Sequence, residues 1–399
     1  MASTTTLLRS RGTGRTPVLS FELFFDLVYV FAVTQLAHGL LDDLTLAGLG
    51  HTTILLLAVW WAWMYTTWAT NWFNPDHLVI RTMLIGVMLA SLVMAVAIPQ
   101  AFGAHGLAFA ISYVALQVGR TAVLVAAVGR RHELGPTFQR ILAWVLAAGC
   151  LWIVGGLLDG WLRVAVWILA LLVDYAGPVA RYATPRLGRS ATTDWSISGD
   201  HLAERCQLFI IVALGETIVI TGSTYGAGEF TAARTTAFVA GFLGSVAMWW
   251  IYFHYTAGRG SEQISSAADP GRIGRSGYTY LHLPMVAGII GSAVAFDLAI
   301  AHPDAPATPA TVATMLVGPA LFLLGHAGFS LVVLSYLPRS RLVGVAVLAA
   351  LGLVLGQVSL LAGLLLAMGG LVFVALWDTV WFFVLIPRRE RRAAVAGPR

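Results

Sequence analysis

The chain has 399 residues, of which 58% are hydrophobic and 11% are charged, and its formal net charge is +5. Soluble domains carry about 25% charged residues, so this composition excludes a soluble enzyme, a nucleic-acid-binding protein and a disordered chain. It predicts a polytopic membrane protein whose partner is the lipid bilayer. The apolar runs are long and lack strand-like alternation, which favours an all-α protein over a β-barrel.

Apolar runs of about 20 residues, the length of a spanning helix, recur along the whole chain and predict about twelve spans. They cover 19–41, 47–69, 78–98, 104–128, 138–158, 161–183, 201–222, 231–255, 278–300, 309–336, 341–365 and 368–386. Most connections are short, and only 184–200 and 256–276 are long. Basic tails at 1–18 and 387–399 flank the spans.

The arginines divide unevenly between the two sides that these spans define. One side receives Arg9, Arg11, Arg15, Arg130, Arg131, Arg140, Arg181, Arg186, Arg189, Arg259, Arg272, Arg275, Arg339, Arg341, Arg388, Arg389, Arg391 and Arg392. The other side receives Arg163 and Arg234, together with the acids Asp42, Asp43, Asp159, Glu229 and Asp304. The positive-inside rule therefore predicts a membrane protein with both termini in the cytoplasm.

The two halves of the chain resemble each other weakly. Trp60–Tyr65 resembles Trp249–Tyr255, and Asp174 aligns with Asp378, with further matches in the same order between them. We expect two six-helix halves, 19–183 and 201–386, joined by a cytoplasmic linker at 184–200. Because six spans is an even number, both halves insert in the same orientation, and the repeats are parallel. Such an interface between halves often holds a pathway, although a duplication can also simply enlarge a scaffold.

Four acids within or beside the spans are candidates for an ion site. A charge at bilayer depth costs about 2.5–3.5 kcal/mol on insertion scales, so such residues face protein or water. Glu22 and Asp26 share one helix face because they are four residues apart, and Glu216 lies near the middle of its span. Glu204 lies at the cytoplasmic entrance of the same span. The alternative is that these acids only form ion pairs that fix helix packing.

Five basic residues are possible charge partners of these acids: Arg81, Arg120, Arg205, His282 and His326. The histidines can titrate near physiological pH, although membrane histidines are more often hydrogen-bonded packing residues. The chain contains no HxxxH or HExxH spacing and no phosphate-binding motif, so we expect no metal and no cofactor. A tryptophan group, Trp60, Trp61, Trp63, Trp68 and Trp72, predicts residues of the interfacial belt or a cage for a cation.

The string SFELFFDLVYVFAVTQLAHGL at Ser20–Leu40 resembles the opening signature of the low temperature requirement protein A family of bacterial membrane proteins. The resemblance continues through WWAWMYTTWATNWFNPD, HLAERCQLFIIVALGETI and WWIYF, and covers most of the chain. The family is named for a growth phenotype in the cold. The string FFDLVYVFAVT is also similar to the first helix of lysosomal-type potassium and proton channels, with Phe25 in place of a serine.

These observations predict a protein that moves a small ion, a proton or a solute along a polar path lined by the acids. One alternative is a membrane-embedded enzyme that acts on lipid-linked substrates. The other is a structural or regulatory protein that adapts the membrane to cold. The substrate and the oligomeric state do not follow from the sequence.

Overall fold

The computed structural model describes residues 6–9, 17–129, 132–190 and 197–381. The predicted tails 1–18 and 387–399 lie partly or wholly outside these residues, as does part of the linker 184–200. Within the described part, the chain is helical without named strands, and twelve helices are long and apolar enough to cross a membrane. The prediction of an all-α polytopic membrane protein with about twelve spans is therefore confirmed.

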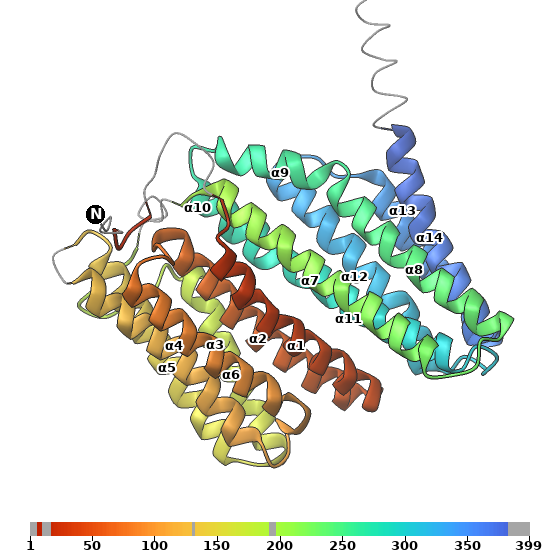
Figure 1. Cartoon of the computed structure of the whole chain (residues 1–399), viewed down its shortest axis with the longest axis horizontal. Helices are drawn as coiled ribbons and strands as arrows, with labels where there is room; N and C mark the ends of the chain where they lie inside the picture. Colours follow the sequence, from red (N-terminus) through yellow and green to blue (C-terminus); the bar gives the residue numbers. More distant parts are fainter. Residues whose placement is uncertain (1–5, 10–16, 130–131, 191–196, 382–399) are drawn as a thin grey trace, which may run out of the picture. The chain divides into compact units, whose positions relative to one another are not determined.

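The chain divides into two compact units. The first unit comprises Met1–Val212 and Ser261–Leu283, and the second comprises Ala213–Gly260 and Pro284–Arg399. Figure 1 shows the helices by label and by colour along the sequence. The boundary falls within one helix, α7 (Gly199–Gly226), so both units contain a part of it.

Six complete spanning helices belong to the first unit. They are α1 (Ser20–Asp42), α2 (Leu46–Trp72), α3 (Leu78–Ala97, extended by the 3₁₀ turn Ile98–Gln100), α4 (Gly106–Val128), α5 (Gly135–Leu157) and α6 (Gly160–Val179). Helix α1 contacts α2 and α3, while α4 packs between α3 and α5, and α6 packs on α5 and α2. These contacts enclose much of α2, whose second half is almost continuously buried.

The second unit is built from the later helices. They are the second part of α7, α8 (Ala232–Phe253), most of α11 (Leu281–Ala301), α12 (Pro309–Leu334), α13 (Arg339–Leu351, followed by the 3₁₀ turn Leu355–Gln357) and α14 (Leu360–Val380). Helix α14 packs on α8, α12 and α13, and α12 also packs on α13. The core of this unit is thus formed around α14.

Threonine or serine side chains cap the N-termini of several spanning helices. The hydroxyl of Thr45 accepts a hydrogen bond from the backbone N–H of Gly48 at 3.1 Å, which caps α2. Thr231, Thr308 and Ser359 cap α8, α12 and α14 in the same way. Such side chains satisfy N–H groups that have no partner inside the first helical turn. These capping residues therefore mark where α2, α8, α12 and α14 begin.

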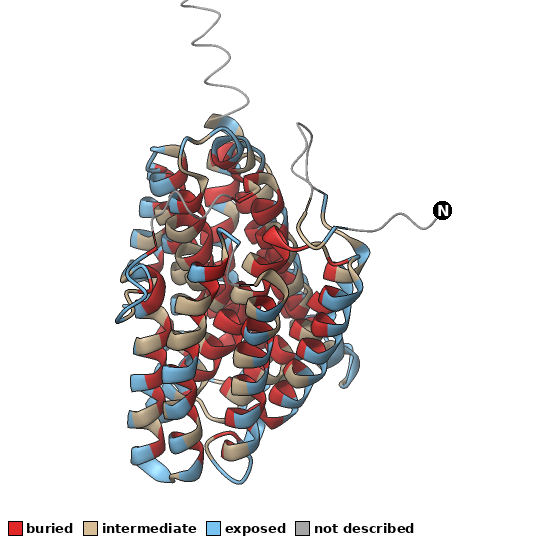
Figure 2. Cartoon of the chain, turned by 90° about the vertical axis from the view of Figure 1, so that its left-hand side faces the viewer, coloured by how far each residue is buried: buried red, intermediate tan, exposed pale blue. Residues whose placement is uncertain are grey.

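The exposed surface of the helices is apolar, which is the reverse of a soluble protein. Figure 2 shows buried residues on the inward faces of the helices and exposed residues on their outward faces. In mid-helix, Leu27, Leu89, Leu172 and Leu376 are each at least 60% exposed. A band of exposed leucines has a favourable solvent only in the hydrocarbon of a bilayer, so the chain is a multi-pass membrane protein.

The long connection predicted at 256–276 is mostly helical. It contains α9 (Thr256–Ser265), α10 (Pro270–Ile273) and a π-helical turn, Gly274–Tyr280. In α9 the buried residues Thr256, Gly260 and Ile264 recur every four positions, while the positions between them are mostly exposed. This amphipathic pattern forms a helix without the continuous apolar run by which the spans were recognised.

Candidate functional site

Two acids of α1 and two bases of α7 form paired rungs inside the first unit, and we call these four residues the acid–base ladder. His201 Nε2 lies 2.9 Å from Glu22 Oε1, and Arg205 Nη2 lies 2.8 Å from Asp26 Oδ1. The acids are four residues apart on their helix, and so are the bases, so each set presents one face. All four side chains are buried.

The outer rung at Glu22 is fully hydrogen-bonded. Its Oε2 accepts hydrogen bonds from Arg9 Nη2 at 2.6 Å and from the backbone N–H of Leu19 at 3.0 Å, and its Oε1 faces His201. Arg9 also donates from its Nε to the carbonyl of Thr70 at 2.8 Å. This carboxylate therefore joins the N-terminal segment, α1 and α7, and its hydrogen bonds are those of a packing node.

The hydrogen bonds of Asn71 determine which ring nitrogen of His201 carries the proton. The amide of Asn71 accepts the backbone N–H of Ser198 at 2.8 Å through Oδ1 and donates to the carbonyl of Ser198 at 2.9 Å through Nδ2. With the amide fixed this way, its Nδ2 also donates to His201 Nδ1 at 3.2 Å. His201 Nδ1 is then an acceptor, so Nε2 carries the hydrogen and donates it to Glu22.

The inner rung at Asp26 is incompletely hydrogen-bonded. Asp26 Oδ1 accepts from Arg205 Nη2 and from Trp63 Nε1, both at 2.8 Å. Asp26 Oδ2 and the Nε and Nη1 of Arg205 have no hydrogen-bond partner within the described residues. Buried donors and acceptors are almost always satisfied, so three open groups in one ion pair mark a place where a proton, an ion or water can bind.

Aromatic rings surround the cation of this inner rung. The guanidinium carbon of Arg205 lies 5.8 Å from the ring centroid of Phe25 and 5.6 Å from that of Trp63. Ring faces stabilise a desolvated guanidinium without taking up its N–H groups. Arg205 is therefore buried while its Nε and Nη1 donors have no acceptor among the described residues, whereas the Glu22 carboxylate is fully hydrogen-bonded.

A second buried network links Arg120 to Asp174. Arg120 Nη2 donates to Gln117 Oε1 at 2.5 Å, Gln117 Nε2 donates to the Tyr113 hydroxyl at 3.1 Å, and that hydroxyl donates to Asp174 Oδ2 at 2.8 Å. Trp152 Nε1 donates to the same oxygen at 3.0 Å. All the bonds point from cation to carboxylate, so two neutral side chains connect a positive and a negative charge through aligned dipoles.

The other predicted site residues lie outside the ladder. Glu204 is exposed, while Glu216 is buried in the second unit. Arg81 pairs with Asp76 at 2.6 Å near the surface, and neither Arg81 nor Arg120 forms an ion pair with a predicted acid in the described chain. Of the proposed arginine partners, the structure brings Arg205 to Asp26.

The two candidate histidines are buried at separate places. His282 Nδ1 lies 3.3 Å from the carbonyl of Gly277, and its ring stacks on Tyr278. His326 Nδ1 accepts a hydrogen bond from Arg341 Nε at 3.2 Å in the second unit. The described residues contain no group of three or more His, Cys, Asp or Glu side chains that could hold a metal ion.

Sequence reasoning missed two basic residues that the structure places in buried clusters. His201 was not named, although it precedes Arg205 by the same four residues that separate Glu22 from Asp26. The sequence predicts that Arg341 lies on the cytoplasmic side, but the structure buries its side chain, which is 2% exposed and pairs with Asp378. Ser340 Oγ donates to Asp378 Oδ1 at 2.8 Å and completes that cluster.

The tryptophans of α2 are mainly core residues. Trp60, Trp61 and Trp63 are at most 1% exposed. Trp60 Nε1 donates to the carbonyl of Thr279 at 2.8 Å, and Trp68 Nε1 donates to its hydroxyl at 3.1 Å. The indoles of Trp60, Trp61 and Trp63 therefore belong to the core of the first unit.

In the described part of the chain, twelve apolar helices with an apolar exposed surface and buried charge clusters define an all-α, multi-pass membrane protein. Residues 18–376 match the family described as bacterial low temperature requirement A protein (LtrA). The chain belongs to this family, which confirms the resemblance of the Ser20–Leu40 signature. It is also 37% identical over 388 residues to an uncharacterised protein of Rhizobium meliloti (strain 1021), a match that covers 97% of this chain and 94% of the relative.

Proposed function

We propose that the protein moves a small ion, a proton or a solute across the membrane, with the Asp26–Arg205 pair as its switchable charge site. The observation that carries this proposal is the incomplete hydrogen bonding of that buried pair. An unsatisfied polar atom in an apolar environment costs about 1–3 kcal/mol, so this site is destabilised until something binds there.

The pair has the chemistry of a switch. When Asp26 is ionised, Arg205 neutralises it, and both charges are compensated. A proton or a cation on Asp26 Oδ2 releases the guanidinium, and an anion on the free Nε and Nη1 groups of Arg205 releases the carboxylate. Binding of either kind leaves one member of the pair, Arg205 or Asp26, without its partner and free to bind the next ion. Alternation between the paired and the separated state then moves charge through the site.

The arginine distribution supports a position for this site. We infer from the positive-inside rule that both termini face the cytoplasm of the inner membrane. Asp26 belongs to the second turn of α1, which begins at Ser20, so the pair lies in the cytoplasmic third of the membrane. The Glu22 rung, with its filled hydrogen bonds, holds α1 and α7 in register beside it.

The proposal is tested by flux in phospholipid vesicles that contain the purified protein. An interior pH dye reports protons, and a set of small cations, anions and solutes is screened for uptake. We expect wild-type flux of at least one of these and no flux for Asp26→Asn. Because this variant strands Arg205 at a cost of about 3–5 kcal/mol, the double variant Asp26→Asn/Arg205→Gln is needed to restore stability.

The double variant separates transport from scaffolding. If the pair is the transport site, the double variant regains thermal stability and still shows no flux. If the double variant regains both stability and flux, the Asp26–Arg205 pair only fixes helix packing, as the fully hydrogen-bonded Glu22 does. Glu22→Gln is the matched control, for which we expect lower stability with flux retained in the folded fraction. A wild-type protein without flux of any tested species would contradict the proposal.

A further inference from the structure

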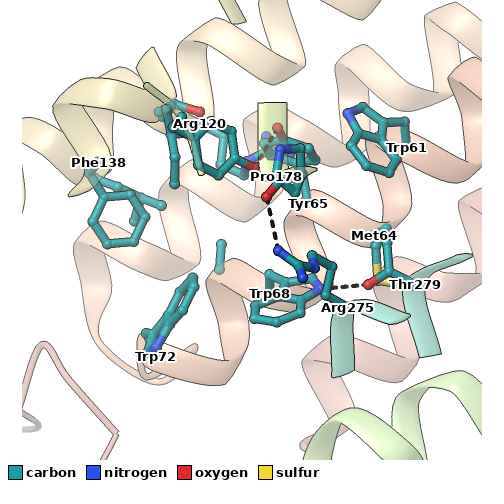
Figure 3. Close-up of a pocket in the computed structure, with 15 residues that line it drawn as sticks. Trp61, Met64, Tyr65, Trp68, Trp72, Arg120, Phe138, Pro178, Arg275 and Thr279 are labelled. Carbon is teal, nitrogen blue, oxygen red and sulfur yellow. Dashed lines mark hydrogen bonds between the residues drawn. The ribbon is translucent and has the colours of Figure 1, made fainter. Parts of the chain in front are cut away.

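A cavity with two arginines and many aromatic rings opens in the first unit, apart from the acid–base ladder (Figure 3). Phe138 and Trp72 lie on one side of the view, and Trp61 and Met64 lie on the other. The lining is mostly apolar, with Tyr65, Trp68 and Tyr182 adding further rings. A mainly apolar pocket with a few polar groups in defined places is the usual form of a small-molecule site.

The charge that faces this cavity is positive. Arg120 and Arg275 are among its lining residues, and the described lining includes no Asp or Glu. Neither arginine forms an ion pair within the described part of the chain. Burial raises the pKa of Tyr182 well above its ordinary value, so this hydroxyl stays neutral and adds no negative charge.

Arg120 is held rigidly at the cavity wall. It is 2% exposed, and its Nη1 donates to Thr66 Oγ1 at 3.0 Å while its Nη2 donates to Gln117. The guanidinium carbon lies 5.2 Å from the ring centroid of Tyr65. A guanidinium has five N–H donors, so two bonds to neutral oxygens leave donors for an incoming acceptor. Its distant charge partner, Asp174, is reached only through Gln117 and Tyr113.

Arg275 is brought to the same cavity by the π-helical turn Gly274–Tyr280. Its Nη1 donates to the carbonyl of Pro178 at 3.1 Å, a bond drawn in Figure 3. The turn is fixed to α2 because both Trp60 and Trp68 donate to Thr279. π-helical turns are rare and occur often at functional sites, and this one places a cation beside an aromatic wall.

The size of the cavity restricts what it can hold. Its volume is about 50 Å³. On the same measure a water molecule needs about 10–15 Å³. The volume therefore fits a group of a few heavy atoms.

We propose that this cavity binds a short-chain carboxylate of the size of acetate or propionate. The carboxylate accepts hydrogen bonds from Arg120 and Arg275, whose planar guanidinium groups suit a carboxylate better than a spherical ion. The short alkyl chain lies against the rings of the aromatic wall. The inference does not depend on the transport proposal, because it concerns binding at a different set of residues.

The test is binding of radiolabelled propionate to the purified protein in phosphatidylcholine nanodiscs, with empty nanodiscs as background. We expect saturable binding that unlabelled acetate and propionate displace and that propionamide, the neutral molecule of the same shape, does not displace. Arg120→Gln should weaken binding at least about tenfold, as loss of a charge-assisted hydrogen bond predicts. Arg275→Gln tests the same site at a less buried position and replaces Arg120→Gln if that variant fails to fold.

The control variant is Arg81→Gln, which removes an exposed arginine that is paired with Asp76 and lies outside the cavity lining. It should bind propionate like the wild type. Equal binding of propionate by Arg275→Gln and wild type, or displacement by propionamide, would overturn the proposal. So would displacement by equimolar chloride, which indicates a simple ion site. Loss of propionate binding in phosphatidylglycerol nanodiscs would assign the cavity to an anionic lipid instead.

Discussion

Equal spacing on two helices explains how four charged or titratable side chains can be buried together. Glu22 and Asp26 are four residues apart, as are His201 and Arg205, so each acid meets one base when the two faces align. Arg205 could be named from sequence because a buried acid needs a cation. His201 could not, because only the alignment of α1 with α7, a tertiary contact, shows which base lies opposite Glu22.

The Tyr113 hydroxyl should carry much of the stability of the Arg120–Asp174 network. Tyr113→Phe removes a donor from Asp174 and the acceptor of Gln117 Nε2, so two buried groups lose a partner. We expect a loss of about 1–3 kcal/mol in the free energy of unfolding. Thermal or denaturant unfolding of the detergent-solubilised protein measures it.

Tyr225→Phe is the matched control for this prediction. The Tyr225 hydroxyl bonds the Thr235 hydroxyl at 2.9 Å in an exposed position, so its removal should change stability by less than about 0.5 kcal/mol. If both tyrosine variants unfold alike, the aligned network adds nothing beyond an ordinary surface hydrogen bond.

Arg341 illustrates why charge counting assigns residues to a side and not to a depth. Its place between two spans suggested a solvated cytoplasmic residue, yet it is buried against Asp378, Ser340 and His326. The same arginine can help to set the orientation of the chain during membrane insertion and can form a buried ion pair afterwards. A sequence without its tertiary contacts does not distinguish these two roles.

At the scale of elements, the long apolar helices could be predicted and the short ones could not. A span is recognised by composition alone, because about 20 apolar residues must cross the hydrocarbon. Helix α9 and the π-helical turn Gly274–Tyr280 have mixed composition, and contacts made elsewhere hold them. The bonds from Trp60 and Trp68 to Thr279 join residues more than 200 positions apart in the chain.

The close contact of α11 with α12 should depend on two glycines. A Cβ at Gly288 would lie 2.5 Å from the backbone nitrogen of Phe322, and one at Gly318 would lie 2.7 Å from that of Ser292. Backbone atoms cannot move aside as a flexible side chain can, so Gly288→Ala and Gly318→Ala should each destabilise the protein by about 1–3 kcal/mol. Thermal unfolding in detergent is the measurement.

Gly369→Ala on α14 provides the comparison, because no atom lies within 4 Å of a Cβ built there. Alanine favours helix over glycine, so this variant should be as stable as the wild type or slightly more so. Equal stability of all three alanine variants would mean that α11 and α12 separate easily and do not require glycine at their crossing.

At the scale of the whole molecule, the membrane orientation stays a prediction with a direct test. The connections at 42–46, 159–160 and 302–306 should face the periplasm, and those at 186–190 and 266–269 should face the cytoplasm. Alkaline phosphatase fusions should be active at the first set, and fluorescent protein fusions should be bright at the second set and after residue 392. A phosphatase that is active at the C-terminus would contradict an even number of spans with both ends inside.

The duplication remains a prediction, and the two positions that the sequence aligns differ in their contacts. Asp174 accepts from Tyr113 and Trp152, whereas Asp378 pairs with Arg341 and Ser340. The sequence shows an aspartate at both aligned positions. It does not show their partners, because one position uses neutral donors and the other uses a cation.

The ladder has a consequence for the order in which the protein is made. Glu22 and Asp26 each meet a base 179 residues further along the chain. At about 5–20 residues per second, a ribosome needs about 10–40 s to add that length. Arg9, already synthesised, is available to Glu22 from the start, but Asp26 enters the bilayer without its cation. Asp26 in α1 therefore lacks its basic partner until α7 has been synthesised, and only then can the ion pair with Arg205 form.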